Sequence, residues 1–185
     1  ENIFVLISIF SVLSFALIGF FDDFLKIKRK DSKGINAYLK LLFQIIFSVM
    51  IFYLISISIN VDQRYLLSVP FYKNLIFDIG YFYLPFAIIV IVGSSNAVNL
   101  TDGLDGLATV PVILVAACFA FISYVTGNIV FSNYLQIPYI EGTGEVSIFC
   151  GAIIGSCLGF LWFNAPPAKI FMGDTGSLSL GGSLG

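Results

Sequence analysis

Long uninterrupted runs of apolar residues constrain the fold of this chain more than any other feature of its sequence. Of its 185 residues, 58% are hydrophobic and only 11% are charged, which is too little charge to hydrate the surface of a soluble domain. A helix needs about 20 apolar residues to cross roughly 30 Å of hydrocarbon. The sequence therefore predicts an all-α, polytopic membrane helix bundle with five spans and the start of a sixth. The predicted spans are Ile3–Phe21, Leu41–Ile59, Tyr81–Val98, Leu107–Gly127 and Val146–Phe163, and Leu178–Gly185 opens the next.

Composition limits the chemistry and the partners of this bundle. The net charge of −2 argues against nucleic-acid binding, for which a basic patch is expected. The chain has no histidine, so acid–base chemistry must come from Asp, Glu, Lys, Tyr or Cys. We expect residues 1–185 to form a single transmembrane catalytic domain that lacks spans at both ends, because the chain opens at Glu1 without Met and closes inside an apolar run.

Basic residues are distributed unevenly among the predicted loops. The loop 60–80 holds only Arg64 and Lys73, and the loop 128–145 holds no basic residue. Because short cytoplasmic loops are enriched in Lys and Arg, the loop between the first two spans is predicted to be cytoplasmic, and later loops alternate. Its basic residues are Lys26, Lys28, Arg29, Lys30, Lys33 and Lys40.

Three acidic clusters occur at predicted span ends: Asp22 with Asp23, Asp102 with Asp105, and Asp174. Two spans separate each cluster from the next, so all three are predicted to emerge on the same face. Carboxylates within reach of the bilayer are costly and by default indicate function. The alternative for the first pair is a solvated helix end, since two adjacent carboxylates need a cation, a proton or water.

The second cluster lies in a polar segment between two apolar helices. Asn99 and the two aspartates offer directional hydrogen bonds to a nucleobase or ribose, and Gly103 permits close backbone approach. The alternative is a polar loop in which Asp102 or Asp105 caps a helix.

The third cluster follows a proline pair. Pro166 and Pro167 end the preceding helix, and Asp174 precedes a new helix that is predicted from Ser177 onward. Helix N-termini attract phosphate, and a nearby carboxylate can hold Mg²⁺. The tetrapeptide 174–177 also occurs in soluble aspartic proteases, but those are all-β proteins that use it twice, so that alternative is rejected.

Gly151, Gly155 and Gly159 form a small-residue face on one predicted span. Such a face allows another helix to approach closely. A packing surface inside the protomer is the favoured interpretation, and a homodimer seam is the alternative.

Taken in order, the segments DDFLK, NLTDGLDGLA and FNAPPAKIFMGDTGSLSLGG resemble the polyprenyl-phosphate N-acetylhexosamine-1-phosphate transferase superfamily. The last two are most similar to the muramoyl-pentapeptide branch. The resemblance implies an Mg²⁺-dependent enzyme of the bacterial inner membrane with its active site on the cytoplasmic face. It would transfer phospho-MurNAc-pentapeptide from UDP-MurNAc-pentapeptide to undecaprenyl phosphate, forming lipid I and UMP for peptidoglycan synthesis. The branch that uses UDP-N-acetylglucosamine is the alternative, and a transporter is a remote one.

The same resemblance implies roles for individual residues. Catalytic positions are Asp22, Asp23, Asp102 and Asp174, and Asp174 is the Mg²⁺ ligand. Apart from the resemblance, the chemistry of a phosphate acceptor favours Asp22 of the first pair as the base that accepts its proton, with Asp23 positioning Lys26 or Mg²⁺. Phe171 would stack on uracil. The implied substrate-binding positions are Lys26, Lys40, Asn99, Gly103, Leu104, Asp105, Asn164 and Phe171.

Overall fold

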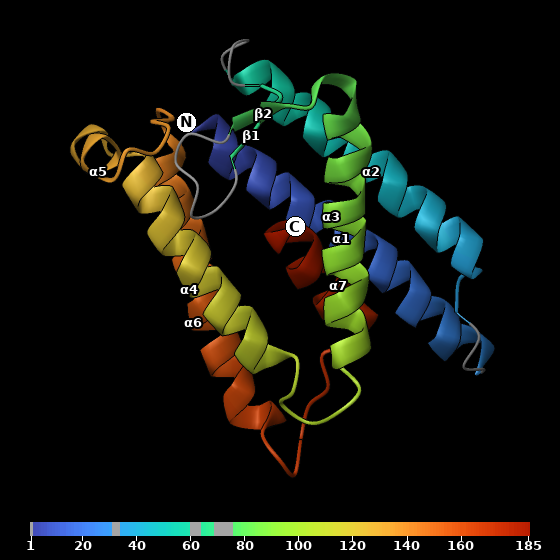
Figure 1. Ribbon diagram of the computed structural model, residues 1–185. Coiled ribbons are helices and arrows are strands. Elements are labelled where there is room, and N and C mark those ends of the chain that lie inside the picture. The colour runs from blue at the N-terminus through green and yellow to red at the C-terminus, as the bar shows by residue number, and fades with distance from the viewer. Residues whose placement is uncertain (1, 31–33, 60–63, 69–75) are drawn as a thin grey trace.

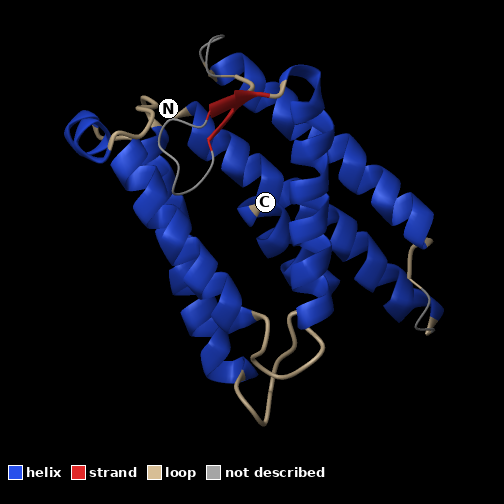
Figure 2. Ribbon diagram, in the orientation of Figure 1, coloured by secondary structure: helices blue, strands red, loops and turns tan. Residues whose placement is uncertain are grey.

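The computed structural model describes residues 2–30, 34–59, 64–68 and 76–185, so Lys33 and Lys73 of the basic-residue pattern lie outside the described part. Helices dominate the structure (Figure 2), and five are long and apolar enough to cross a membrane. The prediction of a polytopic helical bundle is confirmed. The elements are α1 (Ile3–Arg29), α2 (Ala37–Ser58), β1 (Leu66–Ser68), β2 (Ile76–Asp78), η2 (Gly80–Phe82), α3 (Tyr83–Thr101), α4 (Thr109–Thr126), α5 (Ile129–Leu135), η3 (Thr143–Glu145), α6 (Val146–Asn164) and α7 (Gly173–Leu184).

The bundle consists of two packed groups of helices. In the first, α7 packs against both α1 and α3, and α2 packs against α1 and α3; in the second, α4 packs along α6 (Figure 1). Phe15, Ile51 and Ile91 belong to the apolar core of the first group. Val112 and Ile153 belong to the core of the second.

Helix α7 fits between α1 and α3 because it is built of small residues. A Cβ on Gly181 would lie 2.5 Å from the Ser94 carbonyl oxygen of α3, and a Cβ on Gly182 would lie 2.5 Å from the Phe15 ring of α1. Hydroxyl groups join the same surfaces, since Ser11 Oγ donates to the Gly182 carbonyl at 2.8 Å. This close packing fixes the start of α7 against α1.

Helix ends differ from the sequence prediction in two places that affect the site. Helix α1 continues beyond Phe21 to Arg29, because Asp22 and Lys26 pair one turn apart and charged residues of this kind sustain a helix. Helix α7 begins at Gly173, not Ser177, because packing overrides the low helix propensity of its glycines.

The connections divide between the two ends of the bundle (Figure 1). The α3–α4 and α6–α7 connections lie side by side at the lower end, and α1 ends at the lower right, close to the start of α2. The β1–β2 hairpin, in which Leu66 pairs with Asp78, and the short helix α5 lie at the upper end. Neither element was predicted; both are shorter than a membrane span, so the apolar-run criterion passes over them.

The glycine face of α6 is not an internal packing surface among the described residues. A Cβ on Gly151, Gly155 or Gly159 would meet no atom within 4 Å. The favoured interpretation of this face is therefore wrong within the described residues, because α4 packs on a different side of α6, against Ile153 and Cys157.

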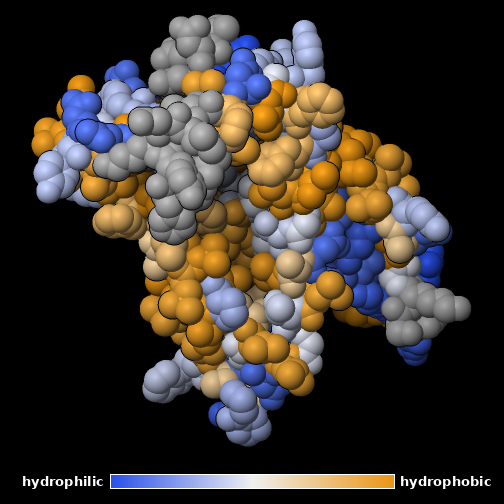
Figure 3. Space-filling model, in the orientation of Figure 1, coloured by the Kyte–Doolittle hydropathy of each residue, from blue (hydrophilic) through white to orange (hydrophobic). Residues whose placement is uncertain are grey.

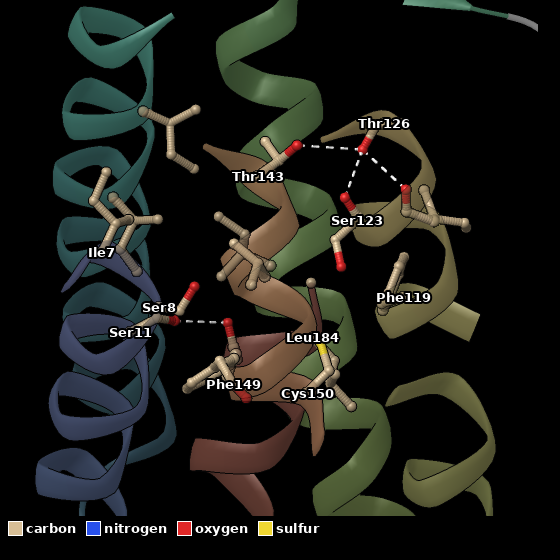
Figure 4. Close-up of a pocket in the computed structure, with 18 of the residues that line it drawn as sticks. Ile7, Ser8, Ser11, Phe119, Ser123, Thr126, Thr143, Phe149, Cys150 and Leu184 are labelled. Atoms are coloured by element: carbon tan, nitrogen blue, oxygen red, sulfur yellow. Dashed lines mark hydrogen bonds between the residues drawn. The ribbon is translucent and has the colours of Figure 1, made fainter. Parts of the chain in front are cut away.

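A cavity of about 460 Å³ lies among α1, α4, α6 and α7 (Figure 4). Its hydroxyl groups come from Ser8, Ser11, Ser123, Thr126, Thr143 and Ser183, and none of the described residues that line it is charged. Charged chemistry must lie elsewhere. Figure 3 shows hydrophobic residues over most of this face and a hydrophilic patch beside α3, on the side of α1 and α2.

Candidate active site

Three carboxylates from two helices meet at the lower end of the bundle. Asp22 and Asp23 come from α1 and Asp174 from the first turn of α7. One oxygen of each lies within 4.8 Å of the others. A Cβ on Gly19 would collide with the Asp174 carbonyl group, and this close packing of α7 against α1 produces the arrangement. The first and third clusters thus lie at the same end of the bundle, as predicted, and they also come into direct contact.

Two lysines enter the carboxylate cluster. Lys26 Nζ lies 2.6 Å from Asp22 Oδ2, 3.6 Å from Asp23 Oδ1 and 2.9 Å from Asp174 Oδ2. Lys40 Nζ, from the first turn of α2, lies 2.9 Å from the same Asp174 oxygen. Three carboxylates and two ammonium groups leave the cluster one net negative charge.

Backbone and hydroxyl donors hold the α1 carboxylates in place. Asp22 is 3% exposed, and its Oδ1 accepts a hydrogen bond of 2.6 Å from the Ile35 amide. A Cβ on Gly34 would collide with this carboxylate, so the loop before α2 needs a glycine there. Asp23 Oδ2 accepts from the amide and the hydroxyl of Thr175, at 3.0 and 2.9 Å.

Asp174 is held by an amide as well as by the lysines. Asn99 Nδ2, at the end of α3, donates to Asp174 Oδ1 at 2.7 Å and to Ser177 Oγ at 2.8 Å. Burial alone would raise the pKa of Asp174, but hydrogen bonding with Asp22 and hydrogen bonds from Lys40, Asn99 and Lys26 outweigh it and hold this pKa well below its usual range. Asp174 is therefore ionised at neutral pH, as a cation ligand must be.

Asp102 lies beside this cluster at the C-terminal end of α3. Burial raises the pKa of Asp102, and the negative charges of Asp174 and Asp23 raise it further, against a lowering by the Gly173 amide. The negative charge of the cluster therefore affects the pKa of Asp102, although the ion pairs of Lys26 and Lys40 are with the other three aspartates.

The remaining predicted residues form a neighbouring group in the α3–α4 and α6–α7 connections. Asn164 is 3% exposed; its Oδ1 accepts from the Gly106 amide at 2.9 Å, and its Nδ2 donates to the Ile170 carbonyl at 2.9 Å. Asp105 Oδ2 accepts from the Ala168 amide at 3.0 Å. Asn164 thus joins the two connections and has its amide engaged within the protein.

Two side chains of this group face outward. Leu104 is 69% exposed and Phe171 is 73% exposed, and Gly103 is exposed as well. Since the connections that carry them are tied together, these groups form an accessible apolar surface next to the charged cluster.

Several contributing residues were not predicted from the sequence. Thr175 and the Ile35 amide hold the aspartates, and only the adjacent motifs point to them. Gln44 is 1% exposed, and its Oε1 accepts a 2.9 Å hydrogen bond from Asn96 Nδ2, which joins α2 to α3. A glutamine inside an apolar run is the signal that could have revealed it.

The arrangement suits a divalent cation and an anionic substrate together. Hard cations such as Mg²⁺ prefer carboxylate oxygens, and Asp22, Asp23 and Asp174 offer three within reach of one ion. Lys26 and Lys40 can instead turn toward phosphate oxygens as substrate enters. The fold and site therefore define a membrane-embedded protein with a cluster of three carboxylates and two lysines at one end of its helices, a set of groups suited to a cation and to phosphate.

Comparison with known proteins agrees with this class. The model for glycosyl transferase family 4 matches residues 5–185, so the chain belongs to that family. It is 67% identical over 178 residues to the phospho-N-acetylmuramoyl-pentapeptide-transferase of Pelagibacter ubique, covering 96% of this chain and 49% of that protein. It is 56% identical over 184 residues to the proteins of the same name from Rickettsia felis and Rickettsia prowazekii, covering 100% of this chain and 51% of each. The chain spans about half the length of these relatives.

Proposed function

We propose that the protein containing this chain transfers phospho-MurNAc-pentapeptide from UDP-MurNAc-pentapeptide to undecaprenyl phosphate, yielding lipid I and UMP in the bacterial inner membrane. The observation that carries the proposal is the cluster of Asp22, Asp23 and Asp174 with two lysines at the membrane rim. A soluble nucleotide and a membrane-bound phosphate can meet at such a rim. The names of the relatives favour the muramoyl-pentapeptide donor over UDP-N-acetylglucosamine.

Mg²⁺ is the proposed cofactor, and Asp174 is its first ligand. Asp22 and Asp23 are near enough to complete an oxygen-ligand set. When bound, the ion would neutralise charge on the donor diphosphate and on the leaving UMP.

The residues of this chain are proposed to act by positioning the two substrates and by neutralising the negative charge of their phosphates. An oxygen of the lipid phosphate attacks the β-phosphorus of the donor, and the bond from that phosphorus to the oxygen bridging to the α-phosphorus breaks, so UMP leaves with those electrons. Lys26 and Lys40 reduce repulsion between the two anions. Asp22 and Asp23 hold Lys26 and the start of α7 in place, which aligns the reacting groups.

Exchange of labelled UMP into UDP-MurNAc-pentapeptide, catalysed by the full-length protein with undecaprenyl phosphate present, tests this function. We expect exchange with that donor and none with UDP-N-acetylglucosamine. Exchange with the second donor alone would replace the proposed substrate, and a transporter would catalyse neither.

Phe171 is proposed to stack on the uracil ring, beside Gly103–Asp105. Phe171→Ala should weaken donor binding by roughly ten- to a hundredfold, since stacking on a base contributes about 1–3 kcal/mol. Phe82→Ala, which removes another exposed phenylalanine, located at the N-terminal end of α3 and so at the other end of that helix from Asp102, should leave binding unchanged. Calorimetric titration with the UDP-sugar measures both, and an unaltered dissociation constant for Phe171→Ala would remove this residue from the nucleotide site.

The active site is proposed to face the cytoplasm. The test uses the full-length protein with its native cysteines replaced, in intact cells whose outer membrane has been made permeable. A membrane-impermeant thiol reagent should label Tyr134→Cys and should not label Lys30→Cys. Both positions are exposed, so accessibility of the side chain itself does not distinguish them. The opposite labelling pattern would reverse the proposed orientation.

A further inference from the structure

Gln44 and Asn96 form a buried pair of amides between α2 and α3, one helical turn from the charged cluster. Gln44 is 1% exposed and lies in an apolar part of α2, LLFQIIF. Asn96 Nδ2 donates to Gln44 Oε1 at 2.9 Å and to the Val92 carbonyl at 2.8 Å, and Gln44 Nε2 donates back to Asn96 Oδ1 at 3.5 Å. Within the described ranges, this pair supplies the only side-chain hydrogen bonds that join α2 to α3.

Each member of the pair lies one turn from a residue that contacts Asp174. Gln44 follows Lys40 by four residues on α2, and Asn96 precedes Asn99 by three residues on α3. Residues at these spacings share one face of a helix. Lys40 Nζ lies 2.9 Å from Asp174 Oδ2, and Asn99 Nδ2 donates to Asp174 Oδ1 at 2.7 Å. The amide pair therefore closes a ring in which α2 and α3 both reach the same carboxylate.

The two helices are held to α7 in different ways. Asn99 Nδ2 also donates to Ser177 Oγ at 2.8 Å, and Ser95 Oγ donates to a backbone carbonyl of α7 at 3.1 Å, so α3 is tied to α7 at two successive turns. The Lys40 side chain reaches the cluster from α2 on a long, flexible stem. The core contacts of α2 are apolar, and apolar contacts have no directional preference. A buried polar pair can fix the register of two helices where apolar packing leaves it free.

We propose that the Gln44–Asn96 pair is a positioning device for the transfer reaction, which holds Lys40 at the carboxylate cluster. Gln44 is buried between the helices and touches neither substrate. It acts through Lys40, whose proposed task is to reduce the repulsion between the donor and acceptor phosphates. This inference rests on the proposed function and adds to it a residue within a membrane span on which the rate depends.

Gln44→Met in the full-length protein tests the proposal, because methionine has nearly the same shape but cannot pair with Asn96. We expect kcat/KM for UDP-MurNAc-pentapeptide to fall about tenfold. A misplacement of about 1 Å can cost about a hundredfold, and Lys26 stays in place to limit the loss. Ser48→Ala is the matched control. Ser48 is a fully buried residue of the same helix whose hydroxyl donates to the Gln44 carbonyl at 2.7 Å, and its removal should leave kcat/KM at the wild-type value.

The reactivity of individual lysines gives a readout that does not depend on transfer. Brief treatment of the purified full-length protein with acetic anhydride, followed by mass spectrometry of its peptides, measures it. Only 17% of the Lys40 side chain is exposed, so its release from the cluster in Gln44→Met should raise its acetylation several-fold. Lys26, which α1 itself supplies with two aspartates, should react as in wild type. Both lysines should react as in wild type in Ser48→Ala.

Three results would overturn the proposal. The first is an unchanged kcat/KM in Gln44→Met, and the second is an unchanged reactivity of Lys40 in that variant. The third is an equal rise in the reactivity of Lys26 and Lys40, which would indicate a general loosening of the bundle. A wild-type protein that transfers nothing, although the lysines of Gln44→Met react as expected, would contradict the proposed function and not the role of the pair in holding Lys40.

Discussion

Asp174→Asn in the full-length protein is expected to lower turnover by about two to three orders of magnitude, as the loss of a principal electrostatic group does. Asp174 is the point where α7, both lysines and Asn99 converge. The asparagine side chain has nearly the same shape as aspartate but carries no charge. It therefore cannot neutralise the proposed Mg²⁺, and it no longer acts as a negatively charged hydrogen-bond acceptor. Higher Mg²⁺ concentrations should restore only a small part of the activity.

Asp78→Asn is the control for this substitution. Asp78 is an exposed aspartate of β2 whose Oδ1 accepts from the Gly80 amide at 2.9 Å, far along the chain from the cluster. Its turnover should equal that of wild type in the UMP-release assay. Near-normal turnover of Asp174→Asn, with unchanged Mg²⁺ dependence, would exclude Asp174 as the cation ligand.

Asp22→Asn is expected to reduce turnover by at least about a hundredfold through lost positioning. Asp22 is buried and both of its oxygens are engaged, Oδ1 by the Ile35 amide and Oδ2 by Lys26. These contacts favour a positioning role over the proton-accepting role that the sequence suggested. Asp23 is more open, with 29% of its side chain exposed and Lys26 at 3.6 Å.

The pH profile separates the two roles of Asp22. A phosphate monoester has a second pKa of about 6, so most of the lipid phosphate is already a dianion at pH 7. If Asp22 positions Lys26 and the α1–α2 loop, the loss in Asp22→Asn should be equal at pH 6.5 and pH 9. Substantial recovery at pH 9, where solvent deprotonates the acceptor, would show instead that Asp22 is the base.

The membrane bundle was predictable because each span is a long apolar run, and the helices confirm it. The ends of the helices were less predictable. Asp22–Arg29 reads as the start of a polar loop, yet it extends α1. Three of its charged side chains, Asp22, Asp23 and Lys26, enter the cluster. A criterion based on apolar length cannot distinguish a charged helical turn at the rim from a loop.

The location of Asp22, Asp23 and Asp174 at one end of the bundle was also predictable, since two spans between successive clusters place them on one face. Their contacts were not. The Lys40–Asp174 pair joins residues 134 positions apart, and it depends on how closely α7 packs against α1. That packing follows from small side chains such as Gly182, whose partner Phe15 carries no sign in the sequence that identifies it.

The pairing of Asp22 with Lys26 has a consequence for biosynthesis. These residues are four apart on one helix, so their ion pair forms as soon as α1 folds at the translocon. Asp174 joins the same lysine from 148 residues further along, and it is synthesised only after four more long apolar helices have emerged. During that interval Lys26 neutralises an aspartate that would otherwise disfavour retention of α1 at the bilayer rim. The lysine thus acts first as an insertion partner for its own helix and later as a shared counterion of the assembled centre.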